Sequence, residues 1–511
     1  MQPLYSQDIF FPYSFNIMTI SPDKKDFFTI IHILGRIILG LSACMLIPFS
    51  VALFYKEMGP FYDFSTAVSL SAALGIVLII LFPLEKDIGW IHTFFIVSMG
   101  WVVASLLGAL PLYLSHHYAC FLDAWFEAMS GFATTGLTLV KDLDHLSFAH
   151  NMWRHLMMFI GGQGIILASL SLLSQAKGSV LGLYIGEARE EKILPNIIAT
   201  ARFIWRVSMV YMILGVSVMG YFLFREGIIL PKAFLHALWL FFASFDTGGF
   251  APQAQNIAYY HSEGLELITI VFMMLGAINF NLHFWVWFKN KKEILKNFEI
   301  HTFLITFFLL LTIVFFALKG YTSLFIFRKG FYQLISAHTG CGFTNLGFAE
   351  LKGMGALSVL AIIFAMMIGG GVCSTTGGIK LMRIGLVFKS FLMEIRKWMM
   401  PNKAVYKDTY HHLEDIIVED KKIRNAFIFF SLFLAVYLGG ALIGMLLGYP
   451  ALPSLFESVS ATANVGLSLG ITSPTMPAFL KATYIIQMWL GRLEFFSVFV
   501  SLGFIFSLFK K

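Results

Sequence analysis

Long apolar runs dominate this chain and predict helices that cross a membrane. A spanning helix needs about 20 apolar residues. Ten runs approach or exceed that length, and they cover residues 28–55, 64–83, 91–114, 152–173, 204–224, 265–288, 303–318, 357–388, 427–447 and 479–509. The pattern therefore predicts an all-α polytopic membrane protein with about ten transmembrane helices.

Four shorter apolar stretches lie between these runs, and none of them is long enough to cross a bilayer. They cover residues 121–130, 233–245, 331–337 and 452–459, and each leads into a loop that contains glycine. The chain thus repeats one unit of span, short helix, glycine loop and span four times. We assign residues 1–88 to two extra N-terminal helices and the four pore repeats to residues 89–176, 177–296, 297–400 and 401–511, the last with a preceding cytosolic loop.

The four glycine loops share the pattern x-x-Gly-(Leu/Phe). Glycine permits backbone angles that turn successive carbonyl groups toward a common axis, and irregular backbone at membrane depth must be buried or line a watery cavity. The pattern predicts a ring of carbonyl oxygens around a small cation. Ordinary tight turns are the alternative for any single loop, and the fourfold repetition argues against them. The predicted filter residues are Thr134, Thr135, Gly136, Leu137, Thr247, Gly248, Gly249, Phe250, Gly340, Cys341, Gly342, Phe343, Asn464, Val465, Gly466 and Leu467.

Composition and charge exclude a soluble or a disordered protein. Hydrophobic residues make up 58% of the chain and charged residues only 13%, against about 25% charged in soluble domains. The net charge of +7 comes largely from Lys and Arg in the connections between repeats, at residues 177–206, 289–296 and 380–424. The positive-inside rule assigns these connections, and hence both termini, to the cytosol. The four cysteines form no C-x-x-C, so neither a disulfide framework nor a zinc site is indicated.

A glycine-rich segment interrupts the apolar run of the third repeat. Each glycine costs about 1 kcal/mol in a helix relative to alanine, so we expect a mobile intramembrane loop, and its role as a gate below the filter rests mainly on the family resemblance stated below. A kinked helix with close packing at glycine is the alternative. The candidate gate residues are Gly369, Gly370, Gly371, Ser374, Thr375, Thr376, Gly377, Gly378 and, from the fourth repeat, Arg492.

Arg492 lies midway along the last apolar run, where an arginine costs several kcal/mol and therefore suggests a function. We expect a fixed positive barrier below the filter. The alternative is a structural pairing with Glu494 or with a carbonyl group, although residues two apart on a helix do not face each other. Lys380 and Arg383 are interpreted equally well as gate residues or as positive-inside anchors.

Four further motifs stand at matching places in the repeats. They are Gly161-Gly162-Gln163-Gly164-Ile165-Ile166, Asn279-Phe280-Asn281-Leu282-His283, Gly369-Gly370-Gly371 with Ser374-Thr375-Thr376-Gly377-Gly378-Ile379-Lys380, and Gly491-Arg492-Leu493-Glu494. With the four loops, they make the chain resemble the TrkH-type members of the Trk/Ktr/HKT superfamily of potassium transporters. The resemblance implies four covalently linked span–pore-loop–span repeats around one pore, two extra N-terminal helices, and potassium as the transported ion.

The same resemblance implies partners and a compartment. It suggests a homodimer with two pores, a cytosolic ring of nucleotide-binding regulatory subunits, and a bacterial cytoplasmic (inner) membrane with its lipids as the setting. The chain has no G-x-x-x-x-G-K-[ST] motif, so we expect no pumping by this chain alone, and we expect no organic cofactor. The basic residues cluster beside the apolar runs, which favours the positive-inside rule over nucleic-acid binding. In related plant-type transporters a serine in the first loop accompanies sodium permeation, and glycine in all four loops favours potassium.

Three residues depart from the expected pattern. Asp246 precedes the second loop, where it either concentrates cations at the outer mouth or is satisfied locally as a helix C-terminal residue. His338 and Cys341 flank the third loop, and a packed filter is a better interpretation of this pair than a soft-metal site.

Two other functions fit the sequence less well. A secondary carrier coupled to sodium or protons would normally have two inverted halves rather than four parallel units. An intramembrane enzyme would need paired carboxylates or a His/Asp set at a membrane face. The nearest candidates, His411, His412, Glu414 and Asp415, lie in a charged loop that we expect to be solvated, so no enzymatic activity is predicted.

Overall fold

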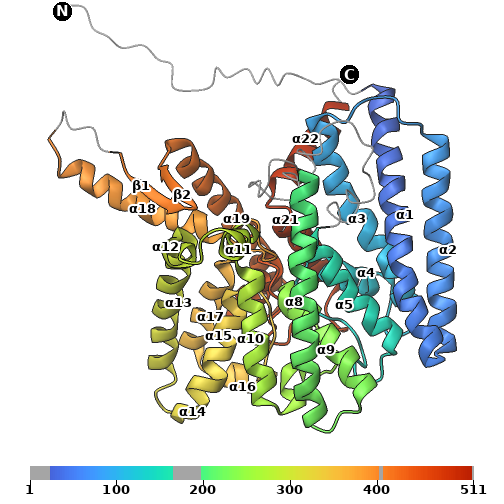
Figure 1. The fold of residues 1–511 in the computed structure, drawn as a ribbon, viewed down its shortest axis with the longest axis horizontal. Coiled ribbons are helices and arrows are strands. Elements are labelled where there is room, and N and C mark those ends of the chain that lie inside the picture. Colours follow the sequence, from blue (N-terminus) through green and yellow to red (C-terminus); the bar gives the residue numbers. More distant parts are fainter. Residues whose placement is uncertain (1–22, 165–196, 402–406, 509–511) are drawn as a thin grey trace, which may run out of the picture.

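The structure, a computed structural model, describes residues 23–164, 197–401 and 407–508, and helices dominate it (Figure 1). Within these residues, six helices are individually long and apolar enough to span a membrane, and two bent helix pairs bring the number to eight. The predicted run 152–173 begins in a helix that ends at Gln163, beyond which part of the run lies outside the described residues. The run 357–388 consists of two helices with the glycine-rich segment between them. The predicted polytopic helical fold is therefore confirmed.

The first two helices form an antiparallel pair at one side of the molecule (Figure 1). They are α1 (Lys24–Tyr55) and α2 (Met58–Leu81). A methyl group added at Gly35 would lie 3.0 Å from the Gly75 carbonyl oxygen, and the reverse distance is the same. Small residues let two backbones approach closely, which is how helices associate in lipid. Most of α2 is exposed, as expected for a helix that faces lipid.

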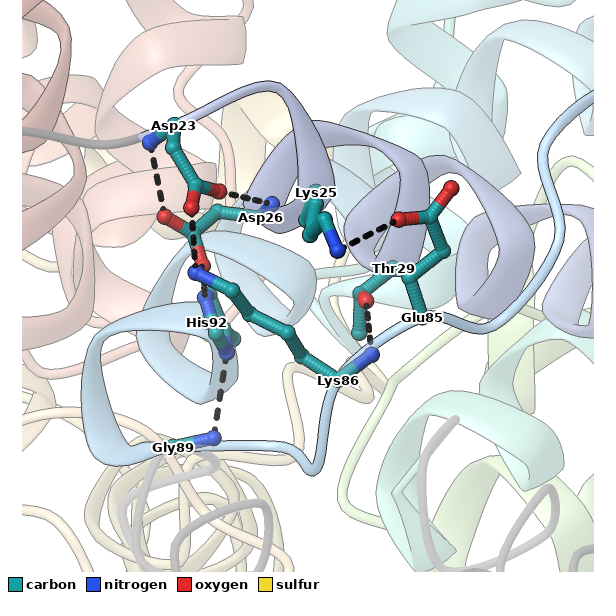
Figure 2. A network of polar contacts seen from close by, with 8 residues as sticks. All are labelled: Asp23, Lys25, Asp26, Thr29, Glu85, Lys86, Gly89 and His92. Carbon is teal, nitrogen blue, oxygen red and sulfur yellow. Dashed lines mark hydrogen bonds and ion pairs between the residues drawn. The ribbon is translucent and has the colours of Figure 1, made fainter.

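A polar network fastens the start of α1 to the connection between α2 and α3 (Figure 2). The Asp23 carboxylate caps α1, and Lys86 Nζ lies 2.8 Å from both Asp23 Oδ2 and Asp26 Oδ1. His92 Nδ1 accepts the Gly89 N–H at 3.1 Å, so Nε2 carries the ring proton and donates to Asp26 at 3.0 Å. The Lys86 ammonium lowers the pKa of Asp23 to about 2. The extra helix pair is thus tied to the first repeat by charge as well as by packing.

The four pore repeats follow in chain order. Repeat one comprises α3 (Trp90–Leu114), the short helix α4 (Phe121–Phe132) and α5 (Phe148–Gln163). Repeat two comprises α8 (Ile197–Arg225), α9 (Leu230–Phe245), the 3₁₀ helix η1 (Asn256–Tyr260), α10 (Glu263–Ala277), α11 (Phe280–Phe288) and α12 (Glu293–Lys296).

Repeats three and four have the same plan with additions. Repeat three comprises α13 (Phe298–Ala317), α14 (Ser323–Phe325), the π-turn η2 (Ile326–Gly330), α15 (Phe331–His338), α16 (Phe348–Gly353), α17 (Ala356–Met367) and α18 (Leu381–Trp398). Repeat four comprises β1 (Thr409–His412), β2 (Glu414–Ile417), α19 (Asp420–Leu446), α20 (Ala451–Thr462), α21 (Ala478–Arg492) and α22 (Phe496–Leu508).

The repeats close into a ring because each inner helix packs on the short helix of a neighbouring repeat. Helix α5 packs on α9, α10 on α15, α17 on α20, and α21 returns to α4 of the first repeat. At that last seam Lys481 Nζ lies 2.6 Å from Asp123 Oδ1, and both side chains are buried. The ring therefore follows the order of the chain and brings its last repeat beside its first.

The inner helices of repeats two and four bend sharply where the sequence analysis had continuous apolar runs. Helices α10 and α11 meet at 100°, and α21 and α22 at 108°. The side chain of Asn279 accepts the Asn281 N–H at 2.8 Å and so starts a new helix. Glu494 and Phe495 both have positive φ, which a continuous helix excludes. A helix cap at Asn279 and left-handed residues at Glu494 and Phe495 thus interrupt the two helices, although the apolar sequence pattern continues through both breaks.

A two-stranded hairpin, β1–β2, stands at the end of the molecule where α1 begins and α22 ends (Figure 1). The expectation of a solvated loop at these residues is wrong in part. His412 is buried against Asn297, with 3.3 Å between Asn297 Nδ2 and His412 Nδ1. Glu293 of α12 accepts the Leu413 N–H at 3.1 Å. The hairpin packs on the start of α13 because these polar groups are satisfied there.

Candidate pore, filter and gate

The four predicted filter loops have the same backbone geometry. Each follows the C-terminus of a short helix, and the residue two before the filter glycine has positive φ, with values of 51°, 49°, 69° and 55° at Thr134, Thr247, Gly340 and Asn464. The filter glycines also have positive φ, at 91°, 75°, 84° and 95° for Gly136, Gly249, Gly342 and Gly466. In each loop the intervening residue donates its N–H to the carbonyl five positions back, at 2.8, 2.8, 3.0 and 2.9 Å. Four separate sequences therefore produce one conformation.

The filter glycines bring the four loops into contact as a closed ring. A methyl group at any one of them would overlap a carbonyl oxygen of the next loop in the chain, and at the last loop it would overlap the first. The pairs are Gly136 with the Gly248 carbonyl, Gly249 with Cys341, Gly342 with Val465, and Gly466 with Thr135. Glycine is required here both by the left-handed backbone and by the approach of the neighbouring carbonyl. The loops that the sequence groups by pattern are thus adjacent in space.

All four filter glycines line one cavity of about 120 Å³, together with Leu351 of α16. Helix α16 lies at the end opposite the β1–β2 hairpin (Figure 1). The short helices direct their C-terminal ends toward the loops, and a helix C-terminus carries partial negative charge. Backbone carbonyl groups and helix C-termini therefore gather at the ring, an arrangement that favours a cation.

The glycine-rich segment 369–380 is buried below the filter and hydrogen-bonded to repeat two. The Gly371 N–H donates to Ala277 O at 2.9 Å, and the Thr375 N–H donates to Gly276 O at 3.2 Å. The hydroxyl oxygen of Thr375 lies 3.1 Å from that of Thr247 in the second filter loop. The segment thus contacts the second filter loop through Thr375, and backbone hydrogen bonds fasten it to the end of α10.

The family comparisons agree with this geometry. The TrkH family model, described as "Cation transport protein", matches residues 69–505. The chain belongs to the TrkH family. It is 34% identical over 482 residues to an uncharacterized cation transporter of Methanocaldococcus jannaschii, covering 93% of this chain and 95% of that protein. It is 30% identical over 491 residues to the Trk system potassium uptake protein TrkH of Escherichia coli, covering 93% and 98%.

A solved structure agrees as well. The crystal structure of the potassium transporter TrkH from Vibrio parahaemolyticus superposes with a TM-score of 0.79 at 27% identity, covering 93% of this chain and 98% of that one. The resemblance inferred from the motifs is confirmed at the level of family and fold.

Arg492 of this TrkH-family chain lies below the filter and binds carbonyl groups of two other repeats. Its Nη1 donates to Thr375 O at 2.7 Å and its Nη2 to Gly161 O at 2.5 Å. Nη1 also lies 3.2 Å from the hydroxyl of Thr134, a filter residue. Glu494 pairs with Arg383 at 2.5 Å. Arg492 therefore connects the first filter loop, the end of α5 and the glycine-rich segment.

Lys380 is buried, and its Nζ donates to Thr376 O at 2.5 Å within the glycine-rich segment. Lys380, Arg492 and Glu494 border a cavity of only about 20 Å³, close to the smallest space that holds a single water. The space below the filter loops is therefore narrow at this point.

Glu299 in the TrkH-family fold was missed by sequence reasoning. It stands in the first turn of α13, where its Oε1 accepts the Val372 N–H at 2.7 Å and its Oε2 accepts from Asn279 Nδ2 at 3.4 Å. It thus holds the start of the glycine-rich segment from α13. The only local signal is Asn297, which precedes it as an N-cap.

The three departures from the family pattern are all buried. Asp246 is the C-cap of α9, and its Oδ1 accepts from Gln163 Nε2 at 2.9 Å, so its carboxylate contacts an amide from the neighbouring repeat. His338 Nε2 lies 2.9 Å from the hydroxyl of Thr306, and Cys341 Sγ donates to Ala243 O at 3.4 Å. Within the described ranges no group of three His, Cys, Asp or Glu residues is arranged to hold a metal. The packed interpretation of His338 and Cys341 fits these contacts.

Proposed function

We propose that this protein mediates potassium uptake across the cytoplasmic membrane through the ring of the four filter loops. The observation that carries the proposal is the cyclic contact of each filter glycine with a carbonyl of the next loop. Carbonyl oxygens arranged in this way replace the hydration shell of a small cation. The relatives in Escherichia coli and Vibrio parahaemolyticus are a potassium uptake protein and a potassium transporter by name, which supports potassium as the ion.

The membrane potential supplies the driving force in this proposal. One elementary charge that moves through 100 mV releases about 2.3 kcal/mol. Inward movement of potassium therefore requires no nucleotide hydrolysis by this chain. A carrier coupled to sodium or protons remains the second candidate, although four parallel repeats around one ring differ from the two inverted halves typical of such carriers.

The segment 369–380 is the gate in this proposal. It lies directly below the second filter loop, and Arg492 fastens it to repeat one through the Thr375 carbonyl. Opening requires the segment to leave these contacts, and we infer that a cytosolic nucleotide-binding ring supplies the force. A homodimer with cytosolic termini is part of the same proposal, and the hairpin end of the molecule is its cytosolic side.

Rubidium uptake into liposomes tests the proposal. The purified protein is reconstituted, a negative internal potential is imposed, and potassium or sodium is added as competitor. Potassium should block rubidium uptake and sodium should not. If the pore is closed without its partner, uptake should appear when the regulatory subunit is added. Absence of uptake with the subunit present, or equal competition by sodium, would contradict the proposal.

A further inference from the structure

Three of the four repeats share a hydrogen bond behind the filter. The residue nine before the filter glycine is Glu127, Gln333 or Glu457, and the residue two after it carries a hydroxyl. The hydroxyl donates to the carboxylate or amide oxygen at 2.9, 2.9 and 2.6 Å, from Thr138, Thr344 and Ser468 respectively. We call this contact the loop clamp. In each of these three loops it ties the outer strand, the segment that follows the filter glycine, to the short helix of the same repeat.

The second repeat has no loop clamp because both positions are apolar. The residue nine before Gly249 is Leu240, and the residue two after it is Ala251. Both are buried. The second loop nevertheless has the same backbone as the other three, with φ of 75° at its glycine. A different group must therefore hold its outer strand.

Arg154 of α5 occupies this role from the neighbouring repeat. Its Nη1 donates to Ala251 O at 3.3 Å, and its guanidinium carbon lies 4.2 Å from the centre of the Phe250 ring. Hydrogen bonding and a cation–π contact thus reach the two residues that follow Gly249. Arg154 also donates through Nε to Glu127 Oε1 at 2.8 Å. One buried guanidinium therefore joins the clamp of the first loop to the second loop.

The internal symmetry of the chain makes this arginine exceptional. In three repeats an inner-helix glycine packs on the last carbonyls of a short helix, at Gly161, Gly276 and Gly491. Arg154 stands seven residues before Gly161, and the corresponding residues are Thr269 and Tyr484. A positive charge occurs here in the first of these three repeats only. Both Arg154 and Glu127 are fully buried, so each requires the other to neutralise its charge.

We propose that Arg154 is a positioning residue for the second filter loop and, through it, a determinant of ion selectivity. It replaces across a repeat boundary the clamp that the other loops carry within their own repeats. Arg154 lines the cavity at the filter with the four filter glycines, so a change in its position alters the carbonyl ring directly. This inference rests on the proposed function of the ring as a selectivity filter.

The first test removes the charged pair without leaving a lone buried charge. The variant Arg154→Met/Glu127→Gln keeps a clamp like that of Gln333 in loop one and removes the Arg154 contacts of loop two. The preference for potassium over sodium as competitor of rubidium uptake should fall by about tenfold, the factor that corresponds to the loss of one charge-assisted hydrogen bond. The matched control is Arg328→Met, which removes a guanidinium paired with Glu263 and Glu266 instead; its preference should be unchanged.

The second test restores the missing contact by a different route. Two substitutions, Leu240→Gln and Ala251→Thr, are added to Arg154→Met/Glu127→Gln. They give loop two the neutral clamp that repeat three has, and the potassium preference should recover. If Arg154→Met/Glu127→Gln does not fold, the readout is whether adding Leu240→Gln/Ala251→Thr recovers folded protein. Wild-type preference in Arg154→Met/Glu127→Gln, or no recovery with the added pair, would overturn the inference. If the unmodified protein itself shows no selective uptake, the proposed function is rejected instead.

Discussion

At the residue scale, the filter glycines are constrained twice. Positive φ excludes most side chains, and the neighbouring carbonyl occupies the space where a Cβ would stand. Gly249 has both constraints, whereas Gly220 of α8 has only ordinary contact with Ala237 at 3.8 Å. The two glycines therefore differ in what a substitution should do, although both lie in the same repeat.

The variant Gly249→Ser should admit sodium, because the added side chain displaces the Cys341 carbonyl from the ring. We expect sodium to compete with rubidium in liposome uptake, with a selectivity change of about tenfold or more, which corresponds to about 1.4 kcal/mol between the two ions. The matched variant Gly220→Ala should keep the potassium preference. Unchanged selectivity in Gly249→Ser would show that this loop is not part of the filter.

Arg492 is the residue whose removal should loosen the gate. Its loss breaks the contacts with Thr375 O and Gly161 O, each a hydrogen bond to a charged group and worth about 1.5–3 kcal/mol. Arg492→Ala should raise basal rubidium uptake at least several-fold without the regulatory subunit. Reduced uptake, or misfolded protein on size-exclusion chromatography, would instead assign Arg492 a structural role.

At the element scale, the hairpin and the gate are connected through the start of α13. His412 contacts Asn297, which caps the helix, and Glu299 two residues later holds the Val372 N–H. These contacts define the short segment through which a force on the hairpin would reach the proposed gate.

Glu299→Gln should weaken the gate anchor, because a neutral amide accepts the Val372 N–H less strongly than a carboxylate. Basal uptake should rise by a few-fold in the absence of the regulatory subunit. Glu350→Gln makes the same change at the N-terminus of α16, where the carboxylate bonds the Gly347 N–H, and should leave uptake unaltered. Equal uptake by Glu299→Gln and the unmodified protein would show that the anchor does not limit opening.

The hairpin should loosen as the pH rises. The hydrogen bond with Asp415, assisted by Glu293, raises the pKa of His411 above its ordinary value of 6.5. A raised pKa means that the ion pair stabilises the hairpin fully below about pH 6.5 and is lost as the pH rises through the folded-state pKa. Amide exchange at Leu413, corrected for its intrinsic pH dependence, should therefore accelerate over that range. His411→Gln should abolish this acceleration. If the acceleration persists in that variant, another titrating group is responsible.

Elements could be predicted from the sequence where the residues that determine them lie close together in the chain. Short apolar runs and the glycine register gave the four loops, and the loops prove adjacent in space. The bends after α10 and α21 were not predictable from hydropathy, since the apolar pattern continues through both. Arg154 was missed because its partner Ala251 lies 97 residues away. The loop clamp could have been found, because a polar residue recurs nine positions before three of the four glycines.

At the scale of the whole molecule, one seam of the ring differs from the other three. Consecutive repeats are joined by the chain itself, but repeats four and one meet without a peptide connection. The buried pair of Lys481 and Asp123 lies at this seam, together with the packing of α21 on α4. The closure of the ring therefore depends on noncovalent contacts at this place.

Lys481→Met should destabilise the protein by about 3–5 kcal/mol, because it leaves the Asp123 carboxylate buried without its cation. Thermal unfolding in detergent should show a lower midpoint. Adding Asp123→Asn should restore much of the loss, since the buried charge is then removed. Lys397→Met, at an exposed pair with Glu394, should have little effect. An unchanged midpoint in Lys481→Met would mean that packing alone closes the seam.

A ring built from one chain can change one quarter at a time. In a channel made of four identical subunits, every mutation near the filter appears four times, so a tolerated change must be tolerated at all four places together. Here one quarter carries Leu240 where the other three carry a polar residue, and Arg154 of the neighbouring repeat contacts its loop instead. Single-chain construction thus lets the filter acquire asymmetry in small, separately selectable steps.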